Sequence, residues 1–354
     1  MLRTVDNDLS QKIRRMSFLS AMFVVAIHNT YRINEFDSLP KWFSLPQLVL
    51  NCGITRTAVP FFFVFAGYFL FRDYDRTEFW WLNKIKTRFV TLAIPYCTWI
   101  AIGIMQFLII NHFRQSKEII NWSSWQCWLE VLGITSAPTC MFHFWFVRIL
   151  LLVVLWAPIV GWIVKRFKLG SLLLLFATAL WMNGGCAEHF LFVMIGAQIA
   201  INGVSDRARS IINGRASLFF AGMLWCLLIT VNVLIFADVV DTYFWMKEFL
   251  FIVMNISGMI FLWGLYDRIR FPAWAERFNP FLGSAFFVYA AHPSIEVLRG
   301  LVLKPVDYDV YSWGYVFAVI VAFYVLMVAV PVCIWWVMKR SAPKPIRIML
   351  FGDR

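Results

Sequence analysis

The chain has 354 residues, of which 61% are hydrophobic and only 15% are charged, and its mean hydropathy is +0.71. Soluble domains contain roughly 45–50% apolar residues, and a chain this apolar would expose large hydrophobic patches to water. The composition therefore excludes a soluble or disordered protein and predicts an integral membrane protein. In such a protein the net charge of +12 reflects basic residues that flank membrane spans, and it does not indicate nucleic-acid binding.

Ten apolar runs are predicted to cross the membrane. Seven reach the length that a bilayer requires, whereas 57–71, 169–182 and 189–202 are shorter. Lys and Arg concentrate in alternate loops only if these three runs also cross, and this pattern places both termini in the cytoplasm. The sequence predicts an all-α polytopic helix bundle, one membrane domain over residues 1–354, with spans at 16–33, 57–71, 89–111, 143–164, 169–182, 189–202, 216–237, 249–266, 281–303 and 312–338.

Two loop segments are predicted to form interfacial helices. In 77–88, aromatic residues accompany Lys84, Lys86 and Arg88, a pattern that suits the inner headgroup layer. In 122–132, three tryptophans lie at helical spacing on the outside. These tryptophans could anchor the segment at the interface, the commoner use, or stack on a sugar ring.

The seven cysteines include no Cys-x-x-Cys pair, which argues against a zinc ribbon or a thioredoxin-like motif. No other metal-binding motif and no nucleotide-binding loop is present, so the chain is not expected to need a metal. Four cysteines fall in predicted external loops, where one or two disulfides of undetermined pairing could form: Cys52, Cys127, Cys140 and Cys186.

Histidines are the most informative polar residues, because ionisable side chains within spans usually face an internal cavity. All five lie in the outer half of the predicted topology, and His28 and His292 are the deepest. His28 follows Arg14 by a rise of about 21 Å and a rotation of about 40° around the helix axis, so the two share a face with Ser17. This face is predicted to line a channel that has an imidazole at its outer end and a cluster of phosphate-binding cations at its inner end: Arg14, Arg15, Lys84, Lys86 and Arg88. The alternative is an ordinary basic collar below a histidine that bonds a neighbouring carbonyl.

The fourth predicted span begins at His143 and Trp145, and Arg148 places a permanent cation about 8 Å inside the outer boundary. Such a charge needs a partner. The candidates are the external carboxylates Glu130, Glu188 and Glu296, or the acceptor substrate itself. Glu296 lies one turn after His292, so its carboxylate could fix the tautomer of that imidazole.

Four stretches, taken together and in this order, resemble the acyltransferase-3 family of membrane acyltransferases over residues 12 to 338. They are Arg14 to His28, Pro60-Phe61-Phe62-Phe63-Val64-Phe65-Ala66-Gly67-Tyr68-Phe69-Leu70, Lys86-Thr87-Arg88 followed by Pro95-Tyr96 and His143-Phe144-Trp145-Phe146, and Val288-Tyr289-Ala290-Ala291-His292-Pro293. Two positions depart from the family pattern: Ala66 replaces a usual serine, and Ser17 replaces the arginine that precedes the family's histidine. Arg14, one turn earlier on nearly the same face, is the candidate to replace that arginine.

The resemblance implies transfer of an acyl group, most often acetyl, from cytoplasmic acyl-CoA to a hydroxyl of an extracytoplasmic or lipid-linked carbohydrate, in the cytoplasmic (inner) membrane. On this hypothesis Arg14, Ser17, Lys86 and Arg88 bind the acyl-CoA co-substrate, and His28 acts as general base. The oxyanion donors would come from Tyr289, His292 or Asn29. The acceptor would contact His143, Trp145, Arg148 and Glu296.

The sequence is also compatible with another mechanism and with other functions. An acyl-histidine intermediate is an alternative mechanism. A transporter or flippase of an acylated glycan is the main competing function, although the paired broken helices and repeated halves of many transporters are not evident. A sensor or scaffold with degenerate sites is a third, and Ser17 and Ala66 are its best support.

Overall fold

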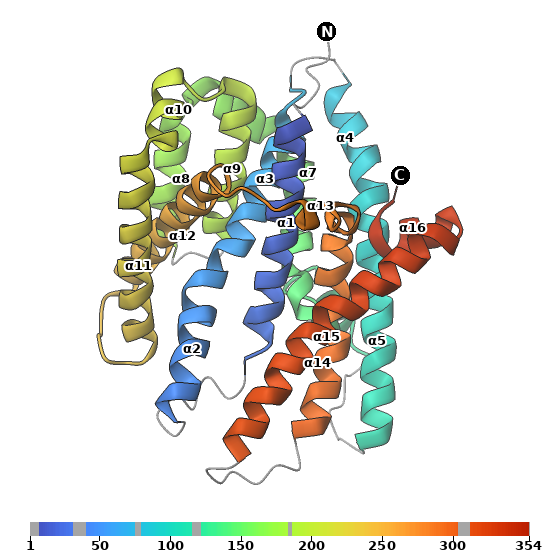
Figure 1. The fold of residues 1–354 in the computed structure, drawn as a ribbon. Helices are drawn as coiled ribbons and strands as arrows, with labels where there is room; N and C mark the ends of the chain where they lie inside the picture. Colours follow the sequence, from blue (N-terminus) through green and yellow to red (C-terminus); the bar gives the residue numbers. More distant parts are fainter. Residues whose placement is uncertain are drawn as a thin grey trace. The chain divides into compact units, whose positions relative to one another are not determined.

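The computed structural model describes residues 7–30, 40–74, 79–114, 122–182, 186–303 and 312–353 (Figure 1). These residues form helices and turns, with no strand among them. The helices fall into two compact units: the first comprises Met1–Arg72 and Ile163–Cys333, and the second comprises Asp73–Trp162 and Ile334–Arg354. Helices α7 and α15 run from one unit into the other.

The first unit contains most of the helices. They are α1 (Asn7–His28), α2 (Lys41–Cys52), η2 (Ile54–Thr57), α3 (Ala58–Phe71), α8 (Leu169–Trp181), α9 (Cys186–Asn202), α10 (Asp206–Asn213), α11 (Arg215–Phe236), α12 (Phe244–Tyr266), α13 (Ala273–Glu276), η5 (Asn279–Ser284), α14 (Ala285–Leu303) and most of α15 (Ser312–Ser341). The second unit contains α4 (Trp80–Arg88), η3 (Phe89–Ala93), α5 (Ile94–Arg114), α6 (Trp125–Val131), η4 (Thr139–Phe144), most of α7 (Trp145–Phe167) and α16 (Lys344–Phe351).

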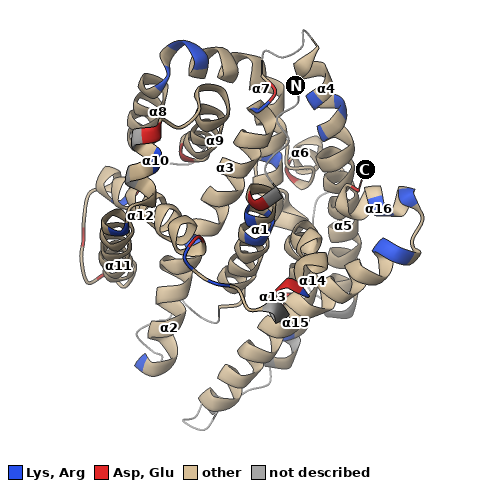
Figure 2. Ribbon diagram, turned by 45° about the horizontal axis from the view of Figure 1, so that its top comes forward, with Lys and Arg blue, Asp and Glu red and all other residues tan. Residues whose placement is uncertain are grey.

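The prediction of an all-α, multi-pass membrane protein is confirmed. Within the described ranges, seven runs of helix are long and apolar enough to cross a bilayer: Lys41–Phe71, Trp80–His112, Thr139–Phe167, Arg215–Phe236, Phe244–Tyr266, Asn279–Arg299 and Trp313–Ser341. The apolar helices α8 and α9 are shorter. Figure 2 shows long stretches of α3 and α5 without a charged residue. The predicted total of ten crossings and the orientation of the termini stay predictions.

Three predicted boundaries were wrong. The span predicted at 57–71 is the second half of a 31-residue run that begins at Lys41, because α2, η2 and α3 follow one another almost without a break. The predicted interfacial helix at 77–88 is not separate, since α4 continues through the π-helical turn η3 into α5. The first helix ends at His28, and residues 31–33 of its predicted span lie outside the described residues.

The predictions for the external loops are confirmed only in part. A helix in 122–132 is confirmed as α6, in which Trp125 is exposed and the Trp128 indole donates to the Trp122 carbonyl. Cys52 was wrongly placed in a loop, because it is buried in α2. Cys52, Cys127 and Cys140 are free thiols, and these three therefore form no disulfide.

Glycines allow α3 and α9 to pack at very short range (Figure 1). A methyl group on Gly67 would collide with the Val193 carbonyl oxygen, and one on Gly196 would collide with the Val64 carbonyl oxygen. Small residues serve the same purpose at many interfaces between membrane helices. The two helices therefore meet backbone to backbone.

Replacing Gly196 by alanine should force α3 and α9 apart and lower the free energy of unfolding by about 1–3 kcal/mol. The measurement is thermal unfolding of the purified protein in detergent. The matched control is Gly170→Ala in α8, where an added methyl group meets open space. Equal unfolding midpoints for the two variants would show that the close contact does not limit stability.

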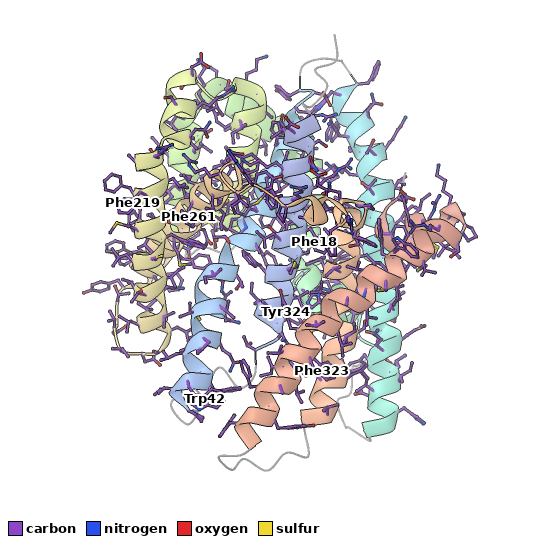
Figure 3. The ribbon with its side chains drawn as sticks, in the orientation of Figure 1. Phe18, Trp42, Phe219, Phe261, Phe323 and Tyr324 are labelled. Atoms are coloured by element: carbon purple, nitrogen blue, oxygen red, sulfur yellow. The ribbon has the colours of Figure 1, made fainter. Side chains whose placement is uncertain are left out.

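Small and aliphatic residues form the buried core between α1, α14 and α15, and partly buried aromatic residues pack around it. Ala21 and Val25 of α1, with Phe18 at the edge, pack against Val288 and Met327. Figure 3 shows Phe18 on α1 and Phe323 and Tyr324 on α15. The Tyr324 hydroxyl also donates to the Met22 carbonyl at 3.4 Å. This packing fixes the middle of α1, the helix that ends at His28.

Candidate functional site

Two histidines that are 264 residues apart in the sequence meet in the first unit. His28 is the last residue of α1 and His292 lies on α14, and their ring centroids are 5.2 Å apart with the rings inclined by 33°. The His292 side chain has no exposed surface. The structure thus brings together the two deepest histidines of the sequence.

The orientation of His292 follows from the proline after it. Pro293 has no backbone N–H, so the Tyr289 carbonyl four residues earlier lacks its helical donor. The Nδ1 atom of His292 lies 2.8 Å from that carbonyl oxygen. A carbonyl can only accept, so Nδ1 carries a proton, and in a neutral ring Nε2 is then an acceptor. The Tyr289 backbone fixes this tautomer.

This tautomer changes two sequence-based interpretations. The Tyr289 carbonyl, and not Glu296, binds Nδ1 of His292, while Oε1 of Glu296 accepts from the Arg299 guanidinium at 3.3 Å. A neutral His292 also cannot donate through Nε2 to an oxyanion. Tyr289, which is buried and has its ring centroid 6.4 Å from that of His292, remains a candidate donor.

The residue after His28 is tied to two other helices. Asn29 is buried, and its amide nitrogen donates to the Ile320 carbonyl of α15 at 2.8 Å. Its amide oxygen accepts from Nη1 of Arg299, on α14, at 2.8 Å. Asn29 therefore remains a candidate oxyanion donor only through its second N–H.

The residue before His28 is tied to α2. The Asn51 amide nitrogen donates to the Ile27 carbonyl at 3.0 Å. Arg56 in turn donates to Asn51 twice, from Nε to the backbone carbonyl at 2.6 Å and from Nη2 to the amide oxygen at 2.9 Å. Arg56 and Arg299 are thus each bonded to an asparagine near the end of α1.

Sequence reasoning missed both arginines. Arg56 lies just before the predicted span 57–71, and Arg299, near the end of the predicted span 281–303, was given no role. For each arginine, a feature of the sequence could have indicated its position. Arg299 follows Glu296 by three residues, which is the spacing of an ion pair on one helical face. Arg56 stands between Thr55 and Thr57, immediately before an apolar helix.

The start of α1 carries the residues predicted to bind the donor. Arg14 is exposed, and it makes no hydrogen bond or ion pair with another described residue; Ser17 is half-buried. Arg15 instead donates to the Asn279 amide oxygen at 3.0 and 3.2 Å and lies over the Phe271 ring. Arg15 therefore supports the fold at this end.

Lys12 fixes the start of α1 to the end of α12. Its Nζ atom lies 2.6 Å from the Asp267 carboxylate and 3.8 Å from the Trp263 ring centroid. Burial lowers the pKa of Lys12 from its usual value, and the hydrogen bond and charge of Asp267 oppose that shift. Lys12 is buried and Asp267 is exposed, and their ion pair joins the two helices.

The remaining predicted residues belong to the second unit. Lys86 is exposed and Arg88 half-buried on α4, while Lys84 pairs with Asp73 at 3.3 Å. The predicted cluster of these cations with Arg14 stays a prediction.

His143 lies in η4, where it is buried against the Phe144 ring, and Trp145 is the first residue of α7. The Arg148 guanidinium donates to the carbonyls of Ile134 and Thr135 at 2.9 and 3.4 Å. Backbone oxygens thus supply the partner for which the sequence had offered carboxylates. A substrate role for these three residues stays a prediction.

One further pair of carboxyl groups was not expected from the sequence. Glu188, at the start of α9, is buried and lies close to Glu248 of α12. Among the described residues no three His, Cys, Asp or Glu side chains are grouped so that they could hold a metal ion.

Comparison with known proteins agrees with the sequence resemblance. A family model described as an acyltransferase domain matches residues 16–336. The succinoglycan biosynthesis protein ExoH of Rhizobium meliloti is 23% identical over 360 residues, an alignment that covers 99% of this chain and 94% of that protein. No solved structure matches the chain significantly.

Proposed function

The chain belongs to the acyltransferase-3 family of membrane acyltransferases, and from that premise we propose that it transfers an acyl group, acetyl in the simplest case, from cytoplasmic acyl-CoA to a hydroxyl of a carbohydrate. The observation that carries the proposal is the meeting of His28 and His292 at the end of α1, within a chain that the family model matches almost throughout. We place the protein in the cytoplasmic membrane, where it would meet a cytoplasmic donor and an extracytoplasmic or lipid-linked acceptor.

In the proposed reaction His28 acts as general base. Its neutral imidazole removes the proton of the acceptor hydroxyl while the hydroxyl oxygen attacks the thioester carbonyl. A C–O bond forms and the C–S bond breaks, and His28 then returns the proton to the departing CoA thiolate. Protons balance over the cycle, and no metal takes part.

The second imidazole supports the first. In the tautomer fixed by Tyr289, neutral His292 offers an acceptor nitrogen beside His28. We assign it to holding the His28 ring in its reactive orientation, in place of the oxyanion role considered from the sequence. The Tyr289 hydroxyl and the second N–H of Asn29 remain the proposed oxyanion donors.

The donor would bind along α1. Arg14 precedes His28 by 14 positions, or about 21 Å of helix, a distance that the extended pantetheine arm of an acyl-CoA can cover. Phosphates held at Arg14 would thus place the thioester near His28. Arg14 is exposed, and its guanidinium suits phosphate.

Arg14→Ala should raise the dissociation constant for CoA about 10-fold, since a charged hydrogen bond contributes roughly 1.5–3 kcal/mol. Isothermal titration of the purified protein with CoA measures this constant. The matched control is Arg166→Ala, which removes an exposed arginine at the end of α7. Unchanged affinity in Arg14→Ala would remove Arg14 from the donor site.

The acceptor class is proposed from the relative. ExoH is named for the biosynthesis of succinoglycan, and we propose by analogy a bacterial surface polysaccharide or its lipid-linked precursor as the acceptor. Purified protein would be incubated with acyl-CoA labelled in the acyl group and a candidate glycan, and the label would then be followed by mass spectrometry. Transfer supports the proposal, whereas glycan uptake into vesicles without acyl-CoA would favour a transporter.

A further inference from the structure

The last turn of α1 is held from both sides of His28. A helix leaves its last four carbonyls without a helical donor, so its end frays unless other groups bind it. Asn51 donates to the Ile27 carbonyl, and Asn29 donates to the Ile320 carbonyl. The residues before and after His28 are therefore both fixed to elements distant in the sequence.

An arginine binds the amide oxygen of each asparagine. A guanidinium has donors only, so it can bond the oxygen end of an amide and not the nitrogen end. Arg56 bonds the Asn51 amide oxygen and Arg299 bonds the Asn29 amide oxygen, at 2.9 and 2.8 Å. Each arginine thereby turns the NH₂ group of its asparagine toward the carbonyl that it must bind.

Both arginines are anchored in turn. Arg56 also donates to the Asn51 backbone carbonyl, and Arg299 also donates to Glu296. Asn51, Asn29 and Arg299 are buried, so neither asparagine can exchange its partners for water at low cost. The two assemblies are alike although they come from different elements: one from α2 and η2, the other from the residue after α1 and α14.

We propose that Asn51 with Arg56, and Asn29 with Arg299, are two positioning pairs that hold the His28 imidazole in place for acyl transfer. The inference rests on the proposed function, because it assigns the pairs to the reaction of His28. As positioning pairs they act through His28, and this role uses only the bonds within each pair and the bonds of the two asparagines to carbonyls of α1 and α15. A shift of about 1 Å in a reacting group can cost as much as 100-fold in rate, so such restraint has a measurable effect.

Asn51→Asp is the sharpest variant. It keeps the shape of the side chain and the oxygen that Arg56 binds, but it replaces the NH₂ donor by an oxygen that repels the Ile27 carbonyl. We expect kcat to fall about 10-fold or more, while KM for acyl-CoA stays within about 3-fold because the donor phosphates bind at the other end of α1. Arg56→Lys, which cannot make both bonds to Asn51, should show a smaller loss of the same kind.

The matched control is Arg268→Gln. Arg268 also bonds two carbonyls, those of Gly264 and Asn213. It follows Asp267, which pairs with Lys12 near the start of α1, and Lys12 precedes His28 by about 24 Å of helix. Arg268→Gln should unfold at a lower temperature than wild type. Its kcat, calculated from the concentration of protein that binds CoA, should stay at the wild-type value.

A second readout does not depend on activity. Hydrogen–deuterium exchange of the peptide that covers residues 22–30 should be faster in Asn51→Asp than in wild type and in Arg268→Gln. The positioning role would be overturned if this peptide exchanged at the wild-type rate in Asn51→Asp. A kcat of Asn51→Asp within 2-fold of wild type would overturn it as well. If wild-type protein transfers no acyl group, the proposed function fails instead, and the exchange result still decides whether Asn51 restrains the helix end.

Discussion

His28→Ala is expected to lower the rate of acyl transfer by about 1,000-fold, within the range that general bases contribute. Without the imidazole the acceptor hydroxyl must attack the thioester while it still holds its proton. Binding of CoA should be unchanged, because the proposed phosphate site lies about 21 Å away along α1. Single-turnover transfer from labelled acyl-CoA, together with titration by CoA, measures both quantities.

The matched control is His112→Ala, which removes an exposed histidine near the end of α5 and should keep wild-type activity. Transfer by His28→Ala within 10-fold of wild type would show that His28 is not the base. The acyl-histidine alternative is tested in the same experiment by omitting the acceptor. A labelled acyl group on wild-type protein but not on His28→Ala would identify His28 as the nucleophile.

The sequence predicted the helical membrane architecture because long apolar runs have few other solutions in a bilayer. It failed for the first half of the run Lys41–Phe71. Polar residues interrupt the apolar pattern there, and Pro46 lies within the helix. The structure buries these polar groups and satisfies them internally: Thr55 bonds the Leu50 carbonyl and Thr57 bonds the Ile54 carbonyl. A hydropathy pattern does not contain those contacts.

The candidate site was predicted only in part. Depth in the predicted topology singled out His28 and His292, and the structure shows in addition that they lie together. Their distance depends on how α1 packs against α14, through residues such as Val25 and Val288, and helix order along the chain does not determine that packing. The partner of Arg148 was unpredictable for a similar reason, since backbone carbonyls bind it and any residue type can supply a carbonyl.

His292→Asn is expected to lower kcat about 100-fold at nearly wild-type stability. The asparagine amide nitrogen can occupy the place of Nδ1 and still donate to the Tyr289 carbonyl, which Pro293 leaves without a helical donor. The variant therefore removes the acceptor nitrogen beside His28 and keeps the bond that supports the helix. The measurements are kcat for transfer and the thermal unfolding midpoint in detergent.

Compared with His292→Asn, the variant His292→Gln should have a higher kcat and a lower unfolding midpoint. Its longer side chain can bring an amide oxygen to the place of Nε2, so it should transfer acyl groups faster than His292→Asn. It leaves the buried Tyr289 carbonyl without its donor, which costs about 1–3 kcal/mol, so it should unfold at a lower temperature. If the glutamine variant were instead the slower of the two, the orientation of the helix, and not the acceptor nitrogen, would be what His292 contributes to the reaction.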